Sequence, residues 1–254
     1  MSRCNRYGKN TPMNNGKFLE VCLNEGCLKQ LVNNISLASN LGAKRFELCS
    51  NLHLGGLTPS VNAIDCAVKN LTNSAELVVM IRPEAGNFFV SAECHQVMQK
   101  QITMAANAGA HGVVFGAVKN GGLDLKVTRS LVATAKQHGL MVTFHRAFDT
   151  LTNPLSALEK LISLEVDRIL TAGTPWQSGK TAFDGLSQLN TYLAHSANQI
   201  EIVMGGGVTL ENAATLWQLI KNHSAKAAVH VHSCVHNENG AINAEAINKL
   251  LSKD

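Results

Sequence analysis

Aromatic residues make up only 5% of this 254-residue sequence, and no apolar run approaches the ~20 residues of a membrane-spanning helix. The first 17 residues are polar and lack the apolar core of a signal peptide. The net charge is only +4, without a basic run or a basic patch interleaved with aromatics. These absences argue against nucleic-acid and membrane partners, and we expect a cytoplasmic protein.

The seven cysteines are an odd number, and their spacing does not suggest a disulfide framework. We therefore interpret them as reduced thiols, which the cytosol maintains. They are set in a chain that is 45% hydrophobic, enough for a full core. A chain of this length buries about 75% of the surface that its unfolded form exposes.

Short apolar runs alternate with longer amphipathic stretches along the chain. Their spacing of roughly 30 residues corresponds to one βα unit. Eight such units in about 250 residues predict an α/β protein of the (β/α)₈ TIM-barrel type. We predict a disordered tail over residues 1–17 and a single barrel domain over residues 18–254. The predicted strands are Phe18–Cys22, Arg45–Cys49, Leu77–Ile81, Gly112–Phe115, Met141–His145, Arg168–Thr171, Ile200–Met204 and Ala228–His232.

Two successive predicted strands end in the same pattern, Glu20-Val21-Cys22 and Glu47-Leu48-Cys49. Residues two apart on a strand share a face, so each strand places a carboxylate and a thiol on one side. A strand buried on both faces normally consists of Val, Ile and Leu. We therefore expect the functional site here, because barrel sites form at the carboxyl ends of the strands.

Other polar residues close to predicted strand ends would line the same mouth. Arg82 and Arg146 are the expected counter-charges for Glu20 and Glu47, because Arg forms bidentate pairs with carboxylates. A charged layer that fills the mouth without binding a ligand is the structural alternative. The further expected pocket residues are Asn51, Met80, His145, Asp149, Thr171 and His232.

Three interpretations of Cys22 and Cys49 remain open. Neighbouring strands lie about 4.8 Å apart, so the two thiols could share one soft metal ion such as Cu(I). Met80 or a histidine could add a third ligand, and His230 and His232 share a face. The same spacing would allow a disulfide. Both cysteines could instead be small hydrophobic core residues.

A glycine run, Gly205, Gly206 and Gly207, follows the seventh predicted strand. Its backbone N–H groups could hold a phosphate, as the corresponding loops of many barrels do. The run could equally form a tight turn without a ligand.

Several segments, in this order, resemble those of the CutC copper homeostasis family over residues 18–234: Leu19–Cys22, Phe46–Leu52, Gly55–Ser60, Val79–Pro83, Gly112–Gly116, Val142–Asp149, Asp167–Thr171 and Gly205–Val208. The resemblance implies a cytosolic barrel, commonly self-associating, that binds Cu(I) through Cys22 and Cys49. The chain departs from the family pattern at Glu84–Asn87, where a basic glycine-rich stretch is usual. It also lacks the usual arginine after His232. Both changes remove positive charge from the mouth.

We therefore predict a homo-oligomeric copper homeostasis protein that binds Cu(I) for buffering or trafficking, its ligands tuned by surrounding polar groups. The alternative is a barrel enzyme that acts on a small polar or phosphorylated metabolite. Glu20, Glu47, His145 and Asp149 would then supply acid–base groups, with Arg82 and the glycine run holding the anion. The sequence assigns no reaction, and a scaffold without chemistry is a third possibility.

Overall fold

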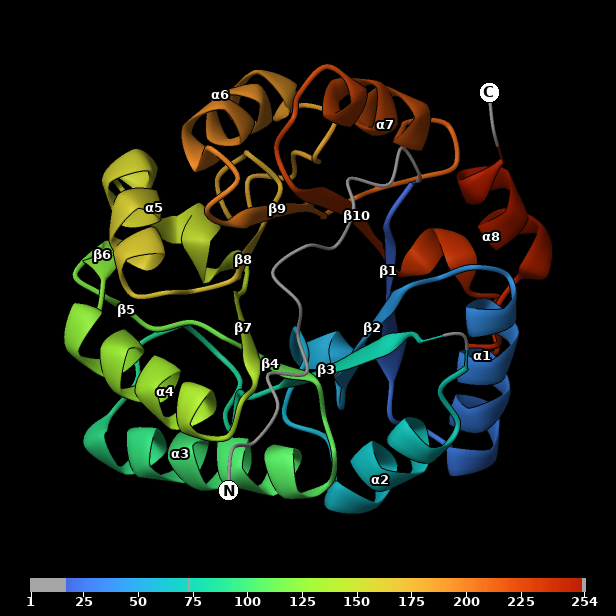
Figure 1. The fold of residues 1–254 in the computed structure, drawn as a ribbon, viewed down its shortest axis with the longest axis horizontal. Coiled ribbons are helices and arrows are strands. Elements are labelled where there is room, and N and C mark those ends of the chain that lie inside the picture. Colours follow the sequence, from blue (N-terminus) through green and yellow to red (C-terminus); the bar gives the residue numbers. More distant parts are fainter. Residues whose placement is uncertain (1–16, 73, 253–254) are drawn as a thin grey trace, which may run out of the picture.

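Eight parallel strands close into a barrel in the order β1-β10-β9-β8-β7-β4-β3-β2, and the helices surround it (Figure 1). The computed structural model describes residues 17–72 and 74–252. This arrangement confirms the predicted (β/α)₈ barrel. The predicted tail over residues 1–17 lies outside the described residues, apart from Lys17.

Each predicted strand is a barrel strand, with bounds that agree within two residues at either end. A short antiparallel hairpin, β5 (Val118–Lys119) and β6 (Gly122–Leu123), was not predicted and lies outside the barrel sheet. The barrel strands are β1 (Leu19–Asn24), β2 (Arg45–Cys49), β3 (Glu76–Met80), β4 (Gly112–Phe115), β7 (Met141–Phe144), β8 (Arg168–Thr171), β9 (Glu201–Met204) and β10 (Ala227–Val231).

The helices cover the outside of the barrel and begin at residues suited to that position. Asn153, for example, precedes a proline and accepts a hydrogen bond from the backbone N–H of Ser156. The α-helices are α1 (Leu28–Asn40), α2 (Val61–Lys69), α3 (Ala92–Asn107), α4 (Leu125–Gln137), α5 (Pro154–Ser163), α6 (Leu186–Ser196), α7 (Ala213–Lys221) and α8 (Ala244–Leu251). The 3₁₀ helices are η1 (Leu52–Leu54), η2 (Arg146–Thr150) and η3 (Ser233–Val235).

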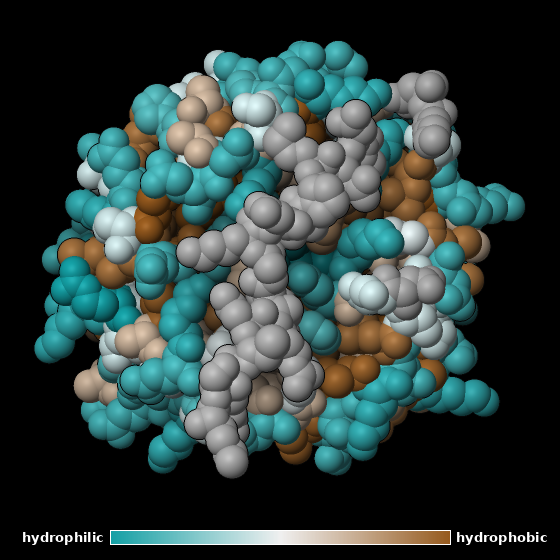
Figure 2. Space-filling view, viewed as in Figure 1, coloured by the Kyte–Doolittle hydropathy of each residue, from teal (hydrophilic) through white to brown (hydrophobic). Residues whose placement is uncertain are grey.

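The molecular surface is mostly hydrophilic on the face drawn in Figure 2, with hydrophobic residues in scattered patches. Within the described part of the chain, none of the helices combines the length and the apolar character needed to span a bilayer.

The main hydrophobic core lies between the strands and the helices. Val21, Phe46 and Leu48 belong to it together with Leu31 and Ile35 of α1. Because side chains alternate along a strand, the residues between them face the inside of the barrel. On β1 and β2 those inward positions carry carboxylates, an arginine and thiols, which places the predicted site in the barrel interior.

Candidate metal centre

Cys22 on β1 and Cys49 at the end of β2 come together inside the barrel. The strand register pairs Cys22 with Glu47, and Cys49 lies one inward-facing position further along β2. The two Sγ atoms and a Glu47 carboxylate oxygen lie within 4.8 Å of one another. Two soft ligands and one hard ligand therefore converge on a single point, a geometry that could hold a metal ion.

The two cysteines are also well packed, with Cys22 only 4% and Cys49 only 1% exposed. They share a hydrophobic cluster with Val78, Met80 and Val114, and Leu52 packs against it. The interpretation of both cysteines as small core residues therefore draws support from this packing.

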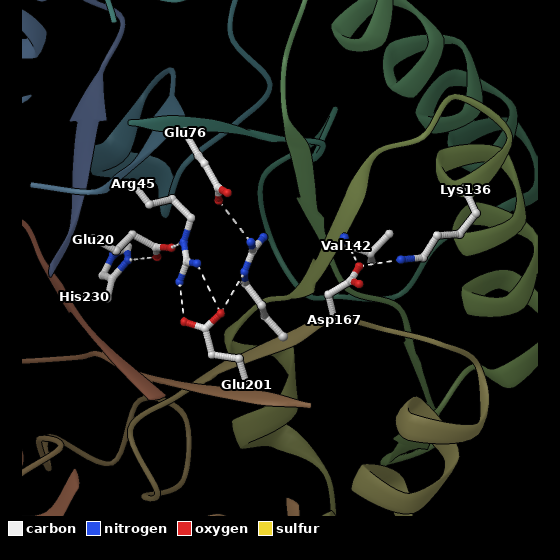
Figure 3. Close-up of polar contacts among 9 residues, drawn as sticks. Glu20, Arg45, Glu76, Lys136, Val142, Asp167, Glu201 and His230 are labelled. Carbon is white, nitrogen blue, oxygen red and sulfur yellow. Dashed lines mark hydrogen bonds and ion pairs between the residues drawn. The ribbon is translucent and has the colours of Figure 1, made fainter. Parts of the chain in front are cut away.

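His230 on β10 joins the cysteines to a neighbouring pair of carboxylates. It lies within hydrogen-bond reach of the Cys22 thiol. Its Nδ1 atom is 2.6 Å from Glu20 (Figure 3), and its Nε2 atom is 3.7 Å from Glu47. Burial lowers the pKa of His230, but the contacts with Cys22, Glu20 and Glu47 raise it well above 6.5. These contacts therefore favour the protonated imidazole.

Both thiols hold their protons more tightly than a free cysteine does. The hydrogen bond with Cys49 and burial raise the pKa of Cys22 well above 9.0. The same hydrogen bond lowers the pKa of Cys49, but burial and the nearby Glu47 carboxylate outweigh it and raise that pKa. Burial also raises the pKa of Glu47, against the influence of His230. A metal ion at this point would have to displace protons from sulfur.

The counter-charge of Glu20 is Arg45, not Arg82 or Arg146 as predicted from the sequence. Arg45 is aligned with Glu20 on the adjacent strand and donates Nε–H to its carboxylate. Its two Nη atoms donate to Glu201 at 2.8 and 3.2 Å (Figure 3). Burial raises the pKa of Glu20, but Arg45 and His230 together lower it below its ordinary 4.5.

The charged layer continues across the barrel through Arg168. This arginine donates to Glu201 at 3.0 Å and to Glu76 at 3.1 Å. Sequence reasoning missed Arg45, Arg168, Glu76 and Glu201 as members of the inner layer. A signal was present, because Arg45 and Arg168 each begin a predicted strand at an inward-facing position.

Arg82 binds backbone carbonyl groups of the loops at the barrel mouth. Its Nη1 donates to Leu54 at 3.0 Å and to Gly56 at 3.1 Å, and its Nη2 donates to Gly86 at 2.8 Å. The predicted pairing with Glu20 or Glu47 fails because those carboxylates lie deeper, beside Arg45 and His230. Met80, by contrast, lies in the cysteine cluster as the sequence suggested.

A second polar group forms around Asp149, apart from the cysteines. Arg146 donates to Asp149 at 2.8 Å, and its guanidinium lies 4.8 Å from the ring centre of Trp176. The Thr171 hydroxyl and the Ala172 N–H, at 3.1 Å, also donate to Asp149. Burial raises the pKa of Asp149 even so. The structure brings together three predicted pocket residues here, but joins them to each other rather than to Glu47.

The remaining predicted residues line the mouth separately. His145 is buried, and its Nδ1 accepts a hydrogen bond from the Ala147 N–H at 3.1 Å. Burial and the Arg82 charge lower the pKa of His145 to about 3. The Nδ1 atom of His232 lies 3.1 Å from the Cys22 carbonyl oxygen rather than its thiol. Asn51 is exposed and precedes η1.

The glycine run forms the turn after β9. Gly206 and Gly207 have φ values of 110° and 67°, which favour glycine. A Cβ atom on Gly206 would lie 2.7 Å from an Nη atom of Arg146, and one on Gly207 would meet Thr181. Neighbouring side chains thus approach both glycines closely, as in a tight turn. Phosphate binding by Gly205, Gly206 and Gly207 stays a prediction.

Fold and site together define a (β/α)₈ barrel whose inner surface carries a thiol–carboxylate group able to hold a metal ion. The chain belongs to the CutC family, whose model matches residues 18–234. A CutC family protein of Pasteurella multocida (strain Pm70) is 38% identical over 199 residues, which cover 78% of this chain and 76% of that protein. Another, from Vibrio vulnificus (strain CMCP6), is 40% identical over 199 residues, covering 78% and 75%.

A solved structure supports the same assignment. The CutC protein of Streptococcus agalactiae, whose name assigns it to copper homeostasis, superposes with a TM-score of 0.73 at 28% identity. The match covers 85% of this chain and 99% of that one.

Proposed function

We propose that Cys22 and Cys49 bind one Cu(I) ion and that the protein buffers or carries copper in the cytoplasm. The observation that carries this proposal is the convergence of both sulfur atoms and a Glu47 oxygen within 4.8 Å. A metal–sulfur bond is about 2.3 Å long, so one ion between sulfurs at this separation can bond to both. Cu(I) favours thiolate and thioether ligands, and the Met80 side chain lies in the same cluster.

The charges around the cysteines suit a monovalent ion. Two thiolates and one Cu(I) ion carry one net negative charge, which the protonated His230 imidazole beside Cys22 would attract. Burial raises the pKa of Glu47, which disfavours a further negative charge beside the sulfur atoms. An ion of low charge therefore suits the site, because the loaded cysteines would add only one negative charge, beside the His230 imidazole.

The competing ion is Zn²⁺. Cys22, Cys49, Glu47 and His230 together are two sulfur, one oxygen and one nitrogen ligand, a set that tetrahedral zinc accepts. The contact with Glu20 uses Nδ1 and leaves Nε2 for zinc, but zinc would need Glu47 and His230 as additional ligands, whereas Cu(I) can be held by the two sulfur atoms alone. We therefore expect Cu(I) to bind with the higher affinity.

The test is a competitive titration of Cu(I) against a chromophoric chelator under reducing conditions, repeated with Zn²⁺. The wild type is compared with Cys22→Ser/Cys49→Ser. The matched control is Cys27→Ser/Cys66→Ser, which also removes two thiols but away from the barrel interior. We expect one tight Cu(I) site in the wild type and in the control, and its loss in the first variant. Equal affinities in all three proteins would refute the proposal.

Two further expectations belong to this function. The free thiols suit a reducing compartment such as the cytoplasm, where Cu(I) is the stable copper ion. We also expect the chain to self-associate, and light scattering during size-exclusion chromatography would measure this. Fractionation of cells followed by immunodetection would test the location.

A further inference from the structure

A cleft of about 150 Å³ opens beside the barrel mouth, at the ends of β3, β4 and β7. Arg82 and His145 line it with polar groups, and Phe88, Phe89, Cys94 and Met98 supply apolar surface. Neither of the proposed copper ligands lies in the cleft wall. The cleft thus combines a cation, a histidine and apolar side chains in one place.

Arg82 carries an uncompensated buried charge in this cleft. It is 9% exposed, and no ion pair of Arg82 with a carboxylate occurs among the described residues. Of the five N–H donors of its guanidinium, three point at the carbonyl groups of Leu54, Gly56 and Gly86. The Nε atom is buried and has no hydrogen-bond partner in the described part of the chain. A buried cation without a counter-ion is costly, and a bound anion would relieve that cost.

His145 offers a second donor to the same cleft. Its Nδ1 accepts from the Ala147 N–H, so the proton of the neutral ring resides on Nε2. Within residues 17–72 and 74–252, no acceptor for this N–H is found. The ring is held in place by Phe88, whose centre is 4.9 Å away, and by close contact with Gly116. Phe88 also lies 5.5 Å from the Arg82 guanidinium, so the two donors share one aromatic support.

The volume of the cleft and the charges that line it limit the class of ligand that it can bind. A cavity of about 150 Å³ accommodates a molecule of roughly benzene's size, and the apolar lining favours a short hydrocarbon body. The planar guanidinium matches a carboxylate, whose two oxygens can take the Nε–H and the remaining Nη2–H. Exposed Glu84 also lines the cleft, and its negative charge disfavours a dianion such as phosphate.

We propose that this cleft binds the carboxylate of a small organic acid with a short apolar body, held by Arg82 and His145. The exposed segment 84–87 beside it would shift slightly to bring the carboxylate to Nε. The loop of Gly55 and Gly56 lies between this site and the cysteines: Arg82 donates to the Gly56 carbonyl, and Gly56 also lies close to Cys49. The proposal does not depend on copper binding.

The experiment titrates the reduced full chain with sodium butyrate by calorimetry and saturation-transfer NMR. Butyramide, which has the same shape without the charge, and inorganic phosphate are titrated in parallel. We expect butyrate to bind at least about tenfold more tightly than either comparator, since hydrogen bonds to charged groups supply such a factor. Comparable binding of butyramide, or of phosphate, or no binding of butyrate, would overturn the carboxylate proposal.

Variants test the site in the same assay. Arg82→Gln is expected to weaken butyrate binding about tenfold or more, whereas Arg129→Gln on the exposed face of α4 removes the same charge without effect. Phe89→Glu tests the site without disturbing the core, because Phe89 is 55% exposed. Its new carboxylate should repel butyrate several-fold relative to Phe89→Gln. Equal butyrate affinities for Arg82→Gln and Arg129→Gln, together with equal affinities for Phe89→Glu and Phe89→Gln, would overturn the proposal. Cys22→Ser/Cys49→Ser should bind butyrate with the affinity of the wild type.

Discussion

Replacing Arg45 with methionine should destabilise the protein strongly, and more so at neutral than at acidic pH. Arg45 is 1% exposed and pairs with both Glu20 and Glu201 (Figure 3). Its removal leaves the buried Glu20 and the half-buried Glu201, each with one partner fewer. Breaking a buried ion pair from one side costs about 3–5 kcal/mol. We expect a loss of that size in the free energy of unfolding at about pH 7.5.

The pH dependence follows from the carboxylates. In the wild type the pKa of Glu20 is below its ordinary 4.5, so its contribution to stability is complete above that pH and falls in acid. In Arg45→Met, Glu20 keeps only His230 and Glu201 keeps only Arg168, so burial raises the pKa of the weakened carboxylate and it takes up a proton on folding. Protonation at about pH 7.5, three units above 4.5, costs about 4 kcal/mol per carboxylate, against about 1.4 at pH 5.5. The penalty should therefore shrink by about 2–3 kcal/mol as the solution is acidified.

Urea unfolding followed by circular dichroism at the two pH values measures both effects. Lys69→Met is the matched control, because Lys69 forms an exposed ion pair with Asp65. Its removal should change the unfolding free energy by less than about 0.5 kcal/mol at either pH. A loss below about 1 kcal/mol in Arg45→Met, or one that does not vary with pH, would refute the account of the charged layer.

Three shorter predictions concern other parts of the molecule. Glu47→Gln should let Cys49 ionise at lower pH, because the carboxylate helps to raise that thiol's pKa, and thiolate absorbance during a pH titration would detect it. Gly116→Ala should lower the free energy of unfolding by about 1–3 kcal/mol, because the new Cβ would lie 2.5 Å from the His145 ring. The same displacement of His145 should weaken butyrate binding. Urea unfolding measures the first effect and calorimetry the second. Ser91→Ala should lower unfolding free energy by about 1 kcal/mol, because Ser91 caps α3; a Ser187→Ala control should not.

The strands were predictable from the sequence because burial on both faces makes them apolar runs of characteristic spacing. The runs Arg45–Cys49, Gly112–Phe115 and Arg168–Thr171 agree with the structure at both ends. The hairpin of β5 and β6 was not predictable in this way. Each of its strands has only two residues, too few to show an alternation of apolar and polar side chains.

The meeting of Cys22, Glu47 and Cys49 was also predictable, because alternation along two adjacent strands puts them on one inner face. The partners of the acidic residues were not. Arg45 and Arg82 both belong to segments near β1, and the sequence does not show which of them pairs with Glu20. The strand register determines this partner. The register pairs Glu20 with Arg45, which therefore forms the ion pair. Arg82 instead donates hydrogen bonds to backbone carbonyl groups of the loops.

Under the proposed function, Cu(I) binding should be coupled to folding stability through His230. Among these six side chains, Glu20, Glu76 and Glu201 are balanced by Arg45, Arg168 and His230 when the imidazole holds its second proton. The same cation lies beside Cys22, where a copper dithiolate would carry a negative charge. Binding of Cu(I) to the two cysteines would therefore favour the protonated form of His230. The protonated imidazole in turn keeps its ion pair with Glu20. A Cu(I)-loaded protein should consequently resist unfolding at alkaline pH better than the metal-free protein does, beyond the mass-action effect of binding at neutral pH.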